Sequence, residues 1–251
     1  MAELRVLIVG ASTGLGRCLG VGLAQRGAKL ALMARRQELL DSAVAEAGPT
    51  AVAICGDATD QASTQAAVAE AAERMGGIDA VVYSAALGEL RPIEEIDPDT
   101  WHRAFAINVV GASTVISAAL PHLAESKGMV VCMTSVSASL TSPWPGLASY
   151  TVTKAALDKL VDAWRAEHHE IGFTRLVVGE CAGGEGEGGS QFTAGWDPEL
   201  AGSYFPTWVE RGLLTDKLMD VEHFTDAVEG LLKCGASAGI PSMSITPRRH
   251  F

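Results

Sequence analysis

The sequence contains no block of basic residues, no Cys-x-x-Cys pair and no apolar run that approaches the length needed to span a bilayer. The net charge of −11, without clustered lysines or arginines, argues against nucleic acid as a partner. The five cysteines are scattered, which indicates reduced thiols in a cytoplasmic protein rather than a disulfide framework. We also expect no membrane as a partner, because no run reaches spanning length.

We also expect neither a secretory leader nor a metal site. Its first residues, MAELRVLIVGAS, run directly into a short apolar strand, without the charged region and cleavage site of a signal peptide. Three acidic residues, Glu180, Glu185 and Glu187, lie in a glycine-rich segment, but no histidine supports them as ligands. We interpret this segment as a solvated loop and expect no metal.

What is present fits one large α/β domain covering residues 1–251. The chain is 48% hydrophobic and 20% charged, and neither a repeat nor a linker interrupts it. Apolar runs alternate with helical patterns, which predicts a doubly wound parallel sheet of about seven strands with helices on both faces. Strands are predicted at 5–10, 29–34, 50–55, 78–84, 128–135, 173–180 and 239–246. Helices are predicted from Leu15 to Gly27 and at 38–47, 61–75, 97–125, 149–170 and 221–233, with Asp97 and Asp220 as N-caps.

Three glycines, Gly10, Gly14 and Gly16, stand between the first predicted strand and the first helix. This arrangement lets backbone N–H groups at a helix N-terminus meet a pyrophosphate. The spacing is G-x-x-x-G-x-G rather than the usual dinucleotide pattern G-x-G-x-x-G. It favours a dinucleotide site, although a purely structural turn has the same composition.

The residues after the second strand bear on the choice of cofactor. Ala34 stands where an NAD site usually has an acidic residue, and Arg35 and Arg36 follow it. A guanidinium at this place suits a 2′-phosphate, so the sequence favours NADP(H). The alternative is two solvated arginines at the start of a surface helix.

Tyr150 and Lys154 are neighbours on one face of a predicted helix, because they lie at positions i and i+4. An ammonium beside a phenol favours the phenolate and lowers the tyrosine pKa from its usual value of about 10. Such a tyrosine can pass a proton to a reacting oxygen. Taken alone, however, the pair is more typical of a helix surface.

Several motifs together resemble the short-chain dehydrogenase/reductase family, from Val6 to about Phe173. They are the glycine trio, Asp57 in CGDATD, Asn108 in AFAINVVGA, Ser135 in VVCMTS, and Tyr150-x-x-x-Lys154. The resemblance implies a Rossmann-like fold and an NADP(H)-dependent oxidoreductase that transfers hydride between nicotinamide and a small carbonyl or alcohol substrate. It also implies a homotetramer in which helices around 101–125 and 150–170 pair and bury Leu157, Val161 and Trp164.

The resemblance assigns four catalytic residues. Tyr150 would exchange a proton with the substrate oxygen, while Lys154 would lower the tyrosine pKa and hold the nicotinamide ribose. Asn108 would hold a water in the proton relay, unless it caps a local kink. Asp57 would meet the adenine, unless it is an ordinary turn residue. The expected cofactor contacts are Gly10, Ser12, Thr13, Gly14, Leu15, Gly16, Arg35, Arg36, Asp57, Ala58, Ala85, Tyr150 and Lys154.

The fourth catalytic residue is a serine that would stabilise negative charge on the substrate oxygen. Counting thirteen residues back from the tyrosine, as in family members of this length, indicates Ser137. Counting along the fifth strand indicates Ser135. Because loops absorb insertions and strands do not, we choose Ser135 and keep Ser137 as the alternative.

Three departures from the family pattern affect the edge of the cofactor site. Tyr83-Ser84-Ala85-Ala86 replaces Asn-Asn-Ala-Gly, the Pro-Gly after the sixth strand is missing near 181–183, and the C-terminal DGG-type ending is absent. These departures motivate an alternative, a cofactor-binding sensor or assembly partner without efficient catalysis. We also expect a mobile substrate lid near 182–210 and an apolar substrate. The candidate pocket walls are Trp144, Leu147, Trp196, Tyr204, Phe205 and Trp208.

Overall fold

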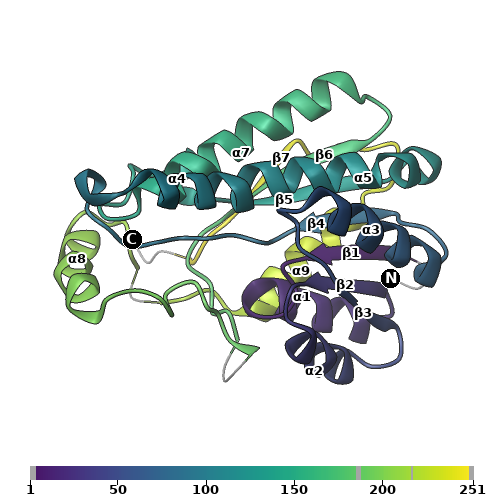
Figure 1. Ribbon diagram of the computed structural model, residues 1–251, viewed down its shortest axis with the longest axis horizontal. Helices are drawn as coiled ribbons and strands as arrows, with labels where there is room; N and C mark the ends of the chain where they lie inside the picture. The colour runs from purple at the N-terminus through teal and green to yellow at the C-terminus, as the bar shows by residue number, and fades with distance from the viewer. Residues whose placement is uncertain (1–3, 185–187, 216, 249–251) are drawn as a thin grey trace.

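The computed structural model describes residues 4–184, 188–215 and 217–248, which form a parallel seven-stranded sheet with helices on both faces (Figure 1). The strand order is β3-β2-β1-β4-β5-β6-β7. The strands are β1 (Arg5–Val9), β2 (Lys29–Ala34), β3 (Ala51–Cys55), β4 (Ala80–Tyr83), β5 (Met129–Ser135), β6 (Gly172–Val178) and β7 (Ser242–Ile245). The Rossmann-like fold predicted from the sequence is thereby confirmed.

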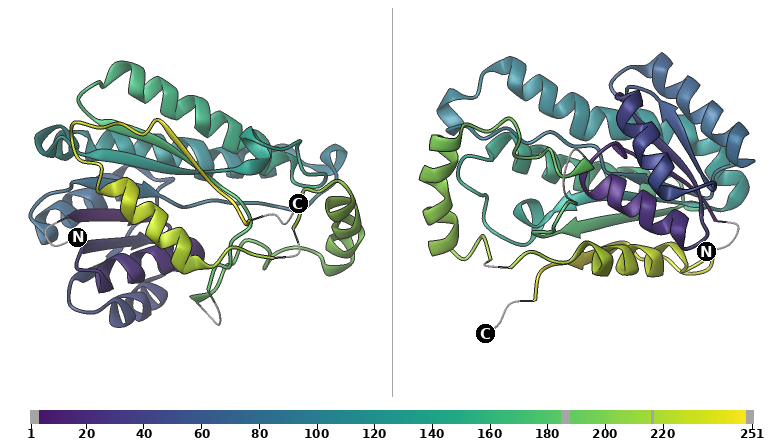
Figure 2. Two further views of the ribbon diagram at one scale, coloured as in Figure 1. Left: turned by 180° about the vertical axis from the view of Figure 1, so that it is seen from behind. Right: turned by 90° about the horizontal axis from the view of Figure 1, so that it is seen from below.

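The helices cover the sheet in two layers, as the views in Figures 1 and 2 show. In chain order they are α1 (Gly14–Gln25), α2 (Gln37–Ala47), α3 (Gln61–Met75), η1 (Ile93–Glu95), α4 (Pro98–Phe105), η2 (Ala106–Val110), α5 (Gly111–Ser126), α6 (Val136–Ser139), α7 (Ala148–Glu167), α8 (Pro198–Glu210) and α9 (Val221–Leu232). Val6 and Ile8 of β1 pack with α1, α2 and α9, whereas Leu7 and Val9 pack with α3, α5 and α7. This alternation follows from the two-residue period of a strand, and it gives the sheet a core on each face.

The predicted strands and long helices are largely confirmed, but the short elements η1 and α6 were not predicted, and two larger differences appear. The long predicted helix at 97–125 begins as expected, because Asp97 caps it through Thr100, but it contains the π-helical turn η2 in the middle. The second larger difference is α8, which the sequence analysis missed directly after the glycine-rich segment. Asp197 caps α8 and Pro198 follows, which repeats the Asp97-Pro98 signal at the start of α4.

The continuous helical stretch Pro98–Ser126 is long and apolar enough to cross a membrane by length and composition alone. The sequence analysis considered uninterrupted apolar runs, whereas this helix qualifies by the mean hydropathy of an 18-residue window that includes polar residues. Val115, Ile116 and Leu123 of α5 are fully buried in the core layer against the sheet. We interpret the stretch as a core helix of the α/β fold.

The predicted subunit interface needs a correction as well. Leu157 and Val161 of α7, which we expected between subunits, are fully buried in the chain's own core. Only Trp164 remains partly exposed among the three named residues. The helical period identified a buried face correctly but could not say which surface covers it.

The strand order reverses between β1 and β4, and this point determines where a ligand can bind. In doubly wound sheets the crevice lies outside the carboxyl ends of the strands at such a reversal. Here the turn after β1 meets the segment after β4: a Cβ added to Gly10 would lie 2.6 Å from the Ala85 nitrogen. The segment after β6 and helix α8 extend beyond this same end of the sheet (Figure 1).

Candidate active site

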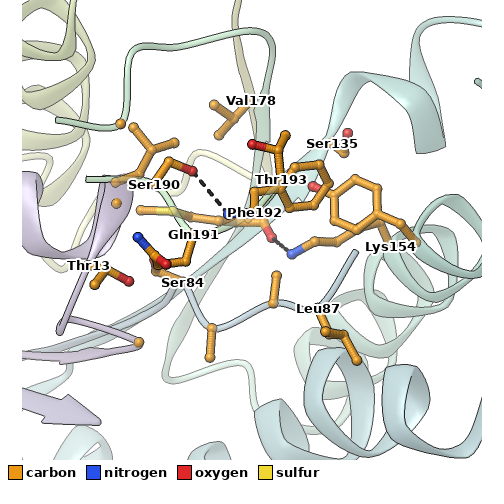
Figure 3. A pocket seen from close by; sticks show the side chains of 18 of the residues that line it. Thr13, Ser84, Leu87, Ser135, Lys154, Val178, Ser190, Gln191, Phe192 and Thr193 are labelled. Atoms are coloured by element: carbon orange, nitrogen blue, oxygen red, sulfur yellow. Dashed lines mark hydrogen bonds between the residues drawn. The ribbon is translucent and has the colours of Figure 1, made fainter. Parts of the chain in front are cut away.

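A cleft of about 730 Å³ lies at the carboxyl ends of the strands. Its lining includes Ser12, Thr13, Arg35, Arg36, Asp57 and Ala85 at one end, and Trp144, Trp196, Phe205 and Trp208 at the other. Ser135, Tyr150 and Lys154 also line it. Figure 3 shows Phe192 in the middle of the cleft, between Thr13 and Ser84 on one side and Ser135 and Lys154 on the other.

The glycine turn forms one wall of this cleft. Gly10 has a φ of 85°, which favours glycine, and Gly14 opens α1. Thr13, the N-cap residue of α1, makes no capping hydrogen bond with its side chain among the described residues. The first N–H groups of α1 are thus suited to an anion. Gly16 does not line the cleft; it allows the helix to pack against the Gly10 carbonyl.

Arg36 links the end of β2 to the glycine turn. Its Nη2 donates to Ser12 Oγ at 3.1 Å and to Thr13 Oγ1 at 3.2 Å. Both Arg35 and Arg36 are exposed and line the cleft beside Ala34. Two guanidinium groups and two hydroxyls therefore gather where an acidic residue would otherwise meet a ribose, a donor set suited to a phosphate monoester.

Asp57 follows β3 and lies at the same end of the cleft as Ala58. Its Oδ1 accepts from the Thr59 nitrogen at 2.9 Å and from Thr59 Oγ1 at 2.7 Å. Burial acts to raise the Asp57 pKa, but the Thr59 hydrogen bonds and the charge of Arg35 outweigh it, so the pKa is lowered. Asp57 thus stays ionised and holds its own turn, as the alternative interpretation expected, while it lines the cleft.

Tyr150 and Lys154 lie on the first turns of α7, with the ammonium 5.7 Å from the centre of the phenol ring. The expected lowering of the tyrosine pKa is not found. Burial raises the pKa of Tyr150 to about 12, opposed only by interaction with the Ser135 side chain. Burial also lowers the pKa of Lys154 to about 8. Lys154 Nζ donates to the Met133 carbonyl at 2.6 Å, and no hydrogen bond joins it to the phenol among the described residues.

The two candidate serines, Ser135 and Ser137, contact each other and both line the cleft. Ser135 is the last residue of β5, and its Oγ lies 3.0 Å from Ser137 Oγ. Ser137 is in turn bonded by Thr151 Oγ1 at 3.3 Å. Both serines line the cleft, and the Ser135 side chain opposes the effect of burial on the Tyr150 pKa, so Ser135 stays our choice for the catalytic role.

Asn108 is fully buried in η2 and does not line the cleft. Its amide pairs with the backbone of Leu87, accepting at 2.7 Å and donating at 2.9 Å, and it also donates to Thr153 Oγ1 at 2.8 Å. The side chain that we expected to hold a relay water is therefore engaged by protein atoms. It positions the segment after β4 and the first turns of α7.

Tyr83, which replaces the first asparagine of the family motif, supports η2 from below. It is fully buried, and its hydroxyl donates to the Ile107 carbonyl at 2.5 Å. A π-helical turn leaves carbonyl groups without their regular helical partners, and Tyr83 satisfies one of them. Tyr83, which departs from the family motif, thus stabilises the π-helical turn that contains Asn108.

The missing Pro-Gly motif is replaced by a backbone pairing that the sequence did not reveal. Met219 N donates to the Glu180 carbonyl at 2.9 Å, and Ala182 N donates to the Met219 carbonyl at 3.0 Å. Glu180 Oε1 also accepts from Thr215 N at 3.0 Å. The chain leading from α8 to α9 therefore holds the segment beside the expected nicotinamide position.

The aromatic end of the cleft was predicted in part. Trp144, Leu147, Trp196, Phe205 and Trp208 line it, whereas Tyr204 stacks behind Trp208 at 6.0 Å between ring centroids. The analysis missed Phe192, whose ring lies 4.8 Å from that of Tyr150. No helical or strand period marks this residue, so its position depends on tertiary contacts alone.

The described residues contain no cluster of three or more His, Cys, Asp or Glu side chains that could hold a metal. Glu185 and Glu187, considered above as ligands, lie outside the described part of the chain. Glu180 has its own partner in the Thr215 nitrogen.

Comparison with known proteins agrees with this geometry. Residues 5–183 match the family described as short chain dehydrogenase. A sorbitol dehydrogenase of Cereibacter sphaeroides is 37% identical over 159 residues, which is 62% of this chain and 61% of that protein, so the match spans about three fifths of the relative.

Two solved structures have the same fold over nearly the whole chain. A 3-ketoacyl-(acyl-carrier-protein) reductase from Brucella melitensis, complexed with NADH, has a TM-score of 0.79 at 22% identity, covering 98% of this chain and 97% of its own. An alcohol dehydrogenase from Thermococcus sibiricus, complexed with 5-hydroxy-NADP, has a TM-score of 0.76 at 23% identity and covers 96% of each chain. With the fold, the ordered motifs and the family match in agreement, this chain belongs to the short-chain dehydrogenase/reductase family of oxidoreductases.

Proposed function

We propose that this protein is an NADP(H)-dependent oxidoreductase that interconverts an apolar ketone and the corresponding alcohol. The observation that carries this proposal is the convergence of Ser135, Tyr150 and Lys154 on one cleft whose other end presents Arg35 and Arg36. The nicotinamide cofactor, when bound, supplies or accepts the hydride. Every other step belongs to the chain's own side chains.

Tyr150 transfers the proton. In the reductive direction its phenol donates a proton to the carbonyl oxygen as negative charge develops there. The Ser135 hydroxyl donates a hydrogen bond to the same oxygen. Lys154 lies one helical turn away, with its ammonium 5.7 Å from the centre of the phenol ring, and would hold the nicotinamide ribose.

Selection between cofactors rests on the arginine pair. Arg36 already bridges β2 and the glycine turn through Ser12 and Thr13, and Arg35 lies beside it in the cleft lining. Charge-assisted hydrogen bonds to a 2′-phosphate contribute about 1.5–3 kcal/mol, which corresponds to roughly a ten- to hundredfold preference for NADPH.

The proposal also includes assembly and a lid. We expect a homotetramer, with Val110 and Val152 at the subunit contacts, since these apolar side chains on η2 and α7 are 55% and 45% exposed. We further propose that the described residues 188–210 close over a bound substrate; residues 185–187 of the predicted lid at 182–210 lie outside the described part of the chain. Sedimentation velocity at micromolar concentration tests the assembly, and a monomer would contradict it.

The function is tested by titrating NADPH and NADH into the purified protein and by following NADPH consumption with a panel of ketones. Tighter NADPH binding together with turnover of an apolar ketone is the expected result. Binding without turnover of any ketone would favour the alternative of a cofactor-binding sensor. Equal affinity for the two cofactors would refute the NADP(H) preference.

A further inference from the structure

A chain of contacting aromatic rings runs from the catalytic tyrosine to the outer end of the cleft. The ring centroids of Tyr150 and Phe192 are 4.8 Å apart, those of Phe192 and Trp196 are 5.4 Å apart, and those of Trp196 and Trp208 are 6.0 Å apart. Trp144 continues the chain at 5.4 Å from Trp208. In a protein that is only 6% aromatic, this concentration at one end of one cleft calls for a ligand-based explanation.

The indole N–H groups of this cluster are already used within the protein. Trp196 Nε1 donates to the Gly88 carbonyl at 2.9 Å, and Trp208 Nε1 donates to the Pro145 carbonyl at 2.9 Å. Trp144 Nε1 donates to Thr141 Oγ1 at 3.3 Å. The three tryptophans therefore offer a ligand carbon surface and no hydrogen-bond donor.

Although Gln191 and Thr193 lie beside Phe192 in the lining, the tryptophan walls are unsuited to a sugar or a sugar acid. Among the described residues that line the cleft, the cations are Arg35, Arg36 and Lys154. The first two lie at the cofactor end, and Lys154 is buried against the Met133 carbonyl. A carboxylate would find no free cation at the aromatic end, and each substrate hydroxyl buried without a partner would weaken binding roughly five- to a hundredfold.

Phe192 has the most constrained place in the ring chain. Its ring lies edge-on to Tyr150, at an interplanar angle of 66°, and rests directly on the backbone of Gly88, where a Cβ would overlap it. Trp196, anchored to the same Gly88, closes the other side of the ring. We therefore expect a carbonyl that reaches Tyr150 to pack against Phe192.

We propose that Phe192 is the specificity-determining residue of this site and that it selects flat, ring-containing apolar ketones over polyhydroxylated ones. The inference rests on the proposed function and gives its substrate class. It sets this chain apart from the relative named sorbitol dehydrogenase, although the two are 37% identical over 159 residues.

The first arm of the test measures turnover. With NADPH, 1-tetralone should be reduced with a kcat/KM at least a hundredfold above that for D-fructose, which is the ketone related to sorbitol. Phe192→Ala should lower kcat/KM for 1-tetralone about five- to twentyfold, mainly through KM, and leave the NADPH Kd within twofold. Val209→Ala is the matched control, because Val209 is 59% exposed on the nearby α8 and does not line the cleft. A preference for fructose, or an unchanged KM in Phe192→Ala, would overturn the proposal.

The second arm needs no turnover. Calorimetric titration of 1-tetralone into the NADP⁺-saturated protein should show binding that Phe192→Ala weakens about five- to twentyfold and Val209→Ala does not change. If this difference appears while no ketone is reduced, the selection by Phe192 holds and the proposed function fails. If wild type and Phe192→Ala bind 1-tetralone equally, or neither binds it, the selection by Phe192 fails whatever the catalytic result.

Discussion

The two ends of the cleft are built in different ways. At the cofactor end, the contacting groups lie on turns directly after β1, β2, β3 and β4, whose register in the parallel sheet is fixed by backbone hydrogen bonds. At the substrate end, the walls come from Trp144, Phe192, Trp196 and Trp208, which are held by ring contacts and by indole bonds to distant carbonyls. One end is thus set by the sheet and the other by side-chain packing, so substitutions at the two ends should change different kinetic constants.

Lys154→Ala should have the largest effect, because this residue lies where the two ends meet. We expect turnover to fall about 10³- to 10⁴-fold and NADPH affinity to fall with it. Steady-state kinetics and cofactor titration measure the two effects. Lys159→Ala is the matched control, since the Lys159 side chain is 84% exposed on the same helix. If Lys154→Ala keeps both normal cofactor affinity and more than a tenth of the activity, the role given to Lys154 is wrong.

Ser135→Ala should follow, with a loss of about 10²- to 10³-fold in kcat, as for removal of a donor to a developing oxyanion. Ser137→Ala should lose less than about tenfold, because Ser137 contacts Ser135 rather than the phenol. Comparing kcat of the two variants decides between the strand-based and loop-based choices. The opposite order would make Ser137 the catalytic serine.

The double variant Arg35→Ala, Arg36→Ala tests the cofactor end by itself. NADPH affinity should fall about ten- to a hundredfold, NADH affinity should stay nearly constant, and KM for the ketone should change little. Fluorescence titration with each cofactor provides the measurement. A matching loss for NADH would show that the arginines support the turn rather than recognise a 2′-phosphate.

Tyr83→Phe should have the smallest effect on catalysis, within about fivefold in kcat, together with a loss of about 1–2 kcal/mol in the free energy of unfolding. The physical reason is the Ile107 carbonyl, which would lose its buried donor next to Asn108. Urea denaturation measures the stability, and Tyr204→Phe in α8 is the control. An unchanged unfolding midpoint would mean that Tyr83 contributes packing only.

The sequence predicted the cofactor end of the cleft, which follows the strands, more completely than the substrate end, which depends on side-chain packing. The glycine turn, the Arg35–Arg36 pair and the Ser135–Tyr150–Lys154 set could be placed because each stands at a fixed distance from a strand or on a helix with a clear period. Phe192 could not be placed, since its contacts join it to Tyr150 and Gly88, which lie far away in the sequence. The pairing of Glu180 with Met219 was hidden for the same reason.

Two misses had signals in the sequence. Asp197-Pro198 marks the N-terminus of α8 as Asp97-Pro98 marks that of α4, but the glycines that precede Asp197 favoured a loop. For Lys154 the i to i+4 spacing correctly predicted proximity to Tyr150, yet spacing alone could not show that the Met133 carbonyl takes the ammonium. Periodicity determines which residues lie on the same face of a helix, whereas tertiary contacts determine which groups each side chain bonds.

The most direct test of the account is the turnover of Tyr150→Phe with NADPH and a ketone that the wild-type protein reduces. The phenyl ring preserves the packing against Phe192, so the fold and the NADPH affinity should persist. Only the proton donor is removed, and kcat should fall about 10²- to 10⁴-fold. A variant that folds, binds NADPH and retains wild-type kcat would contradict the assignment of Tyr150 as the catalytic acid, and with it the mechanism proposed for this cleft.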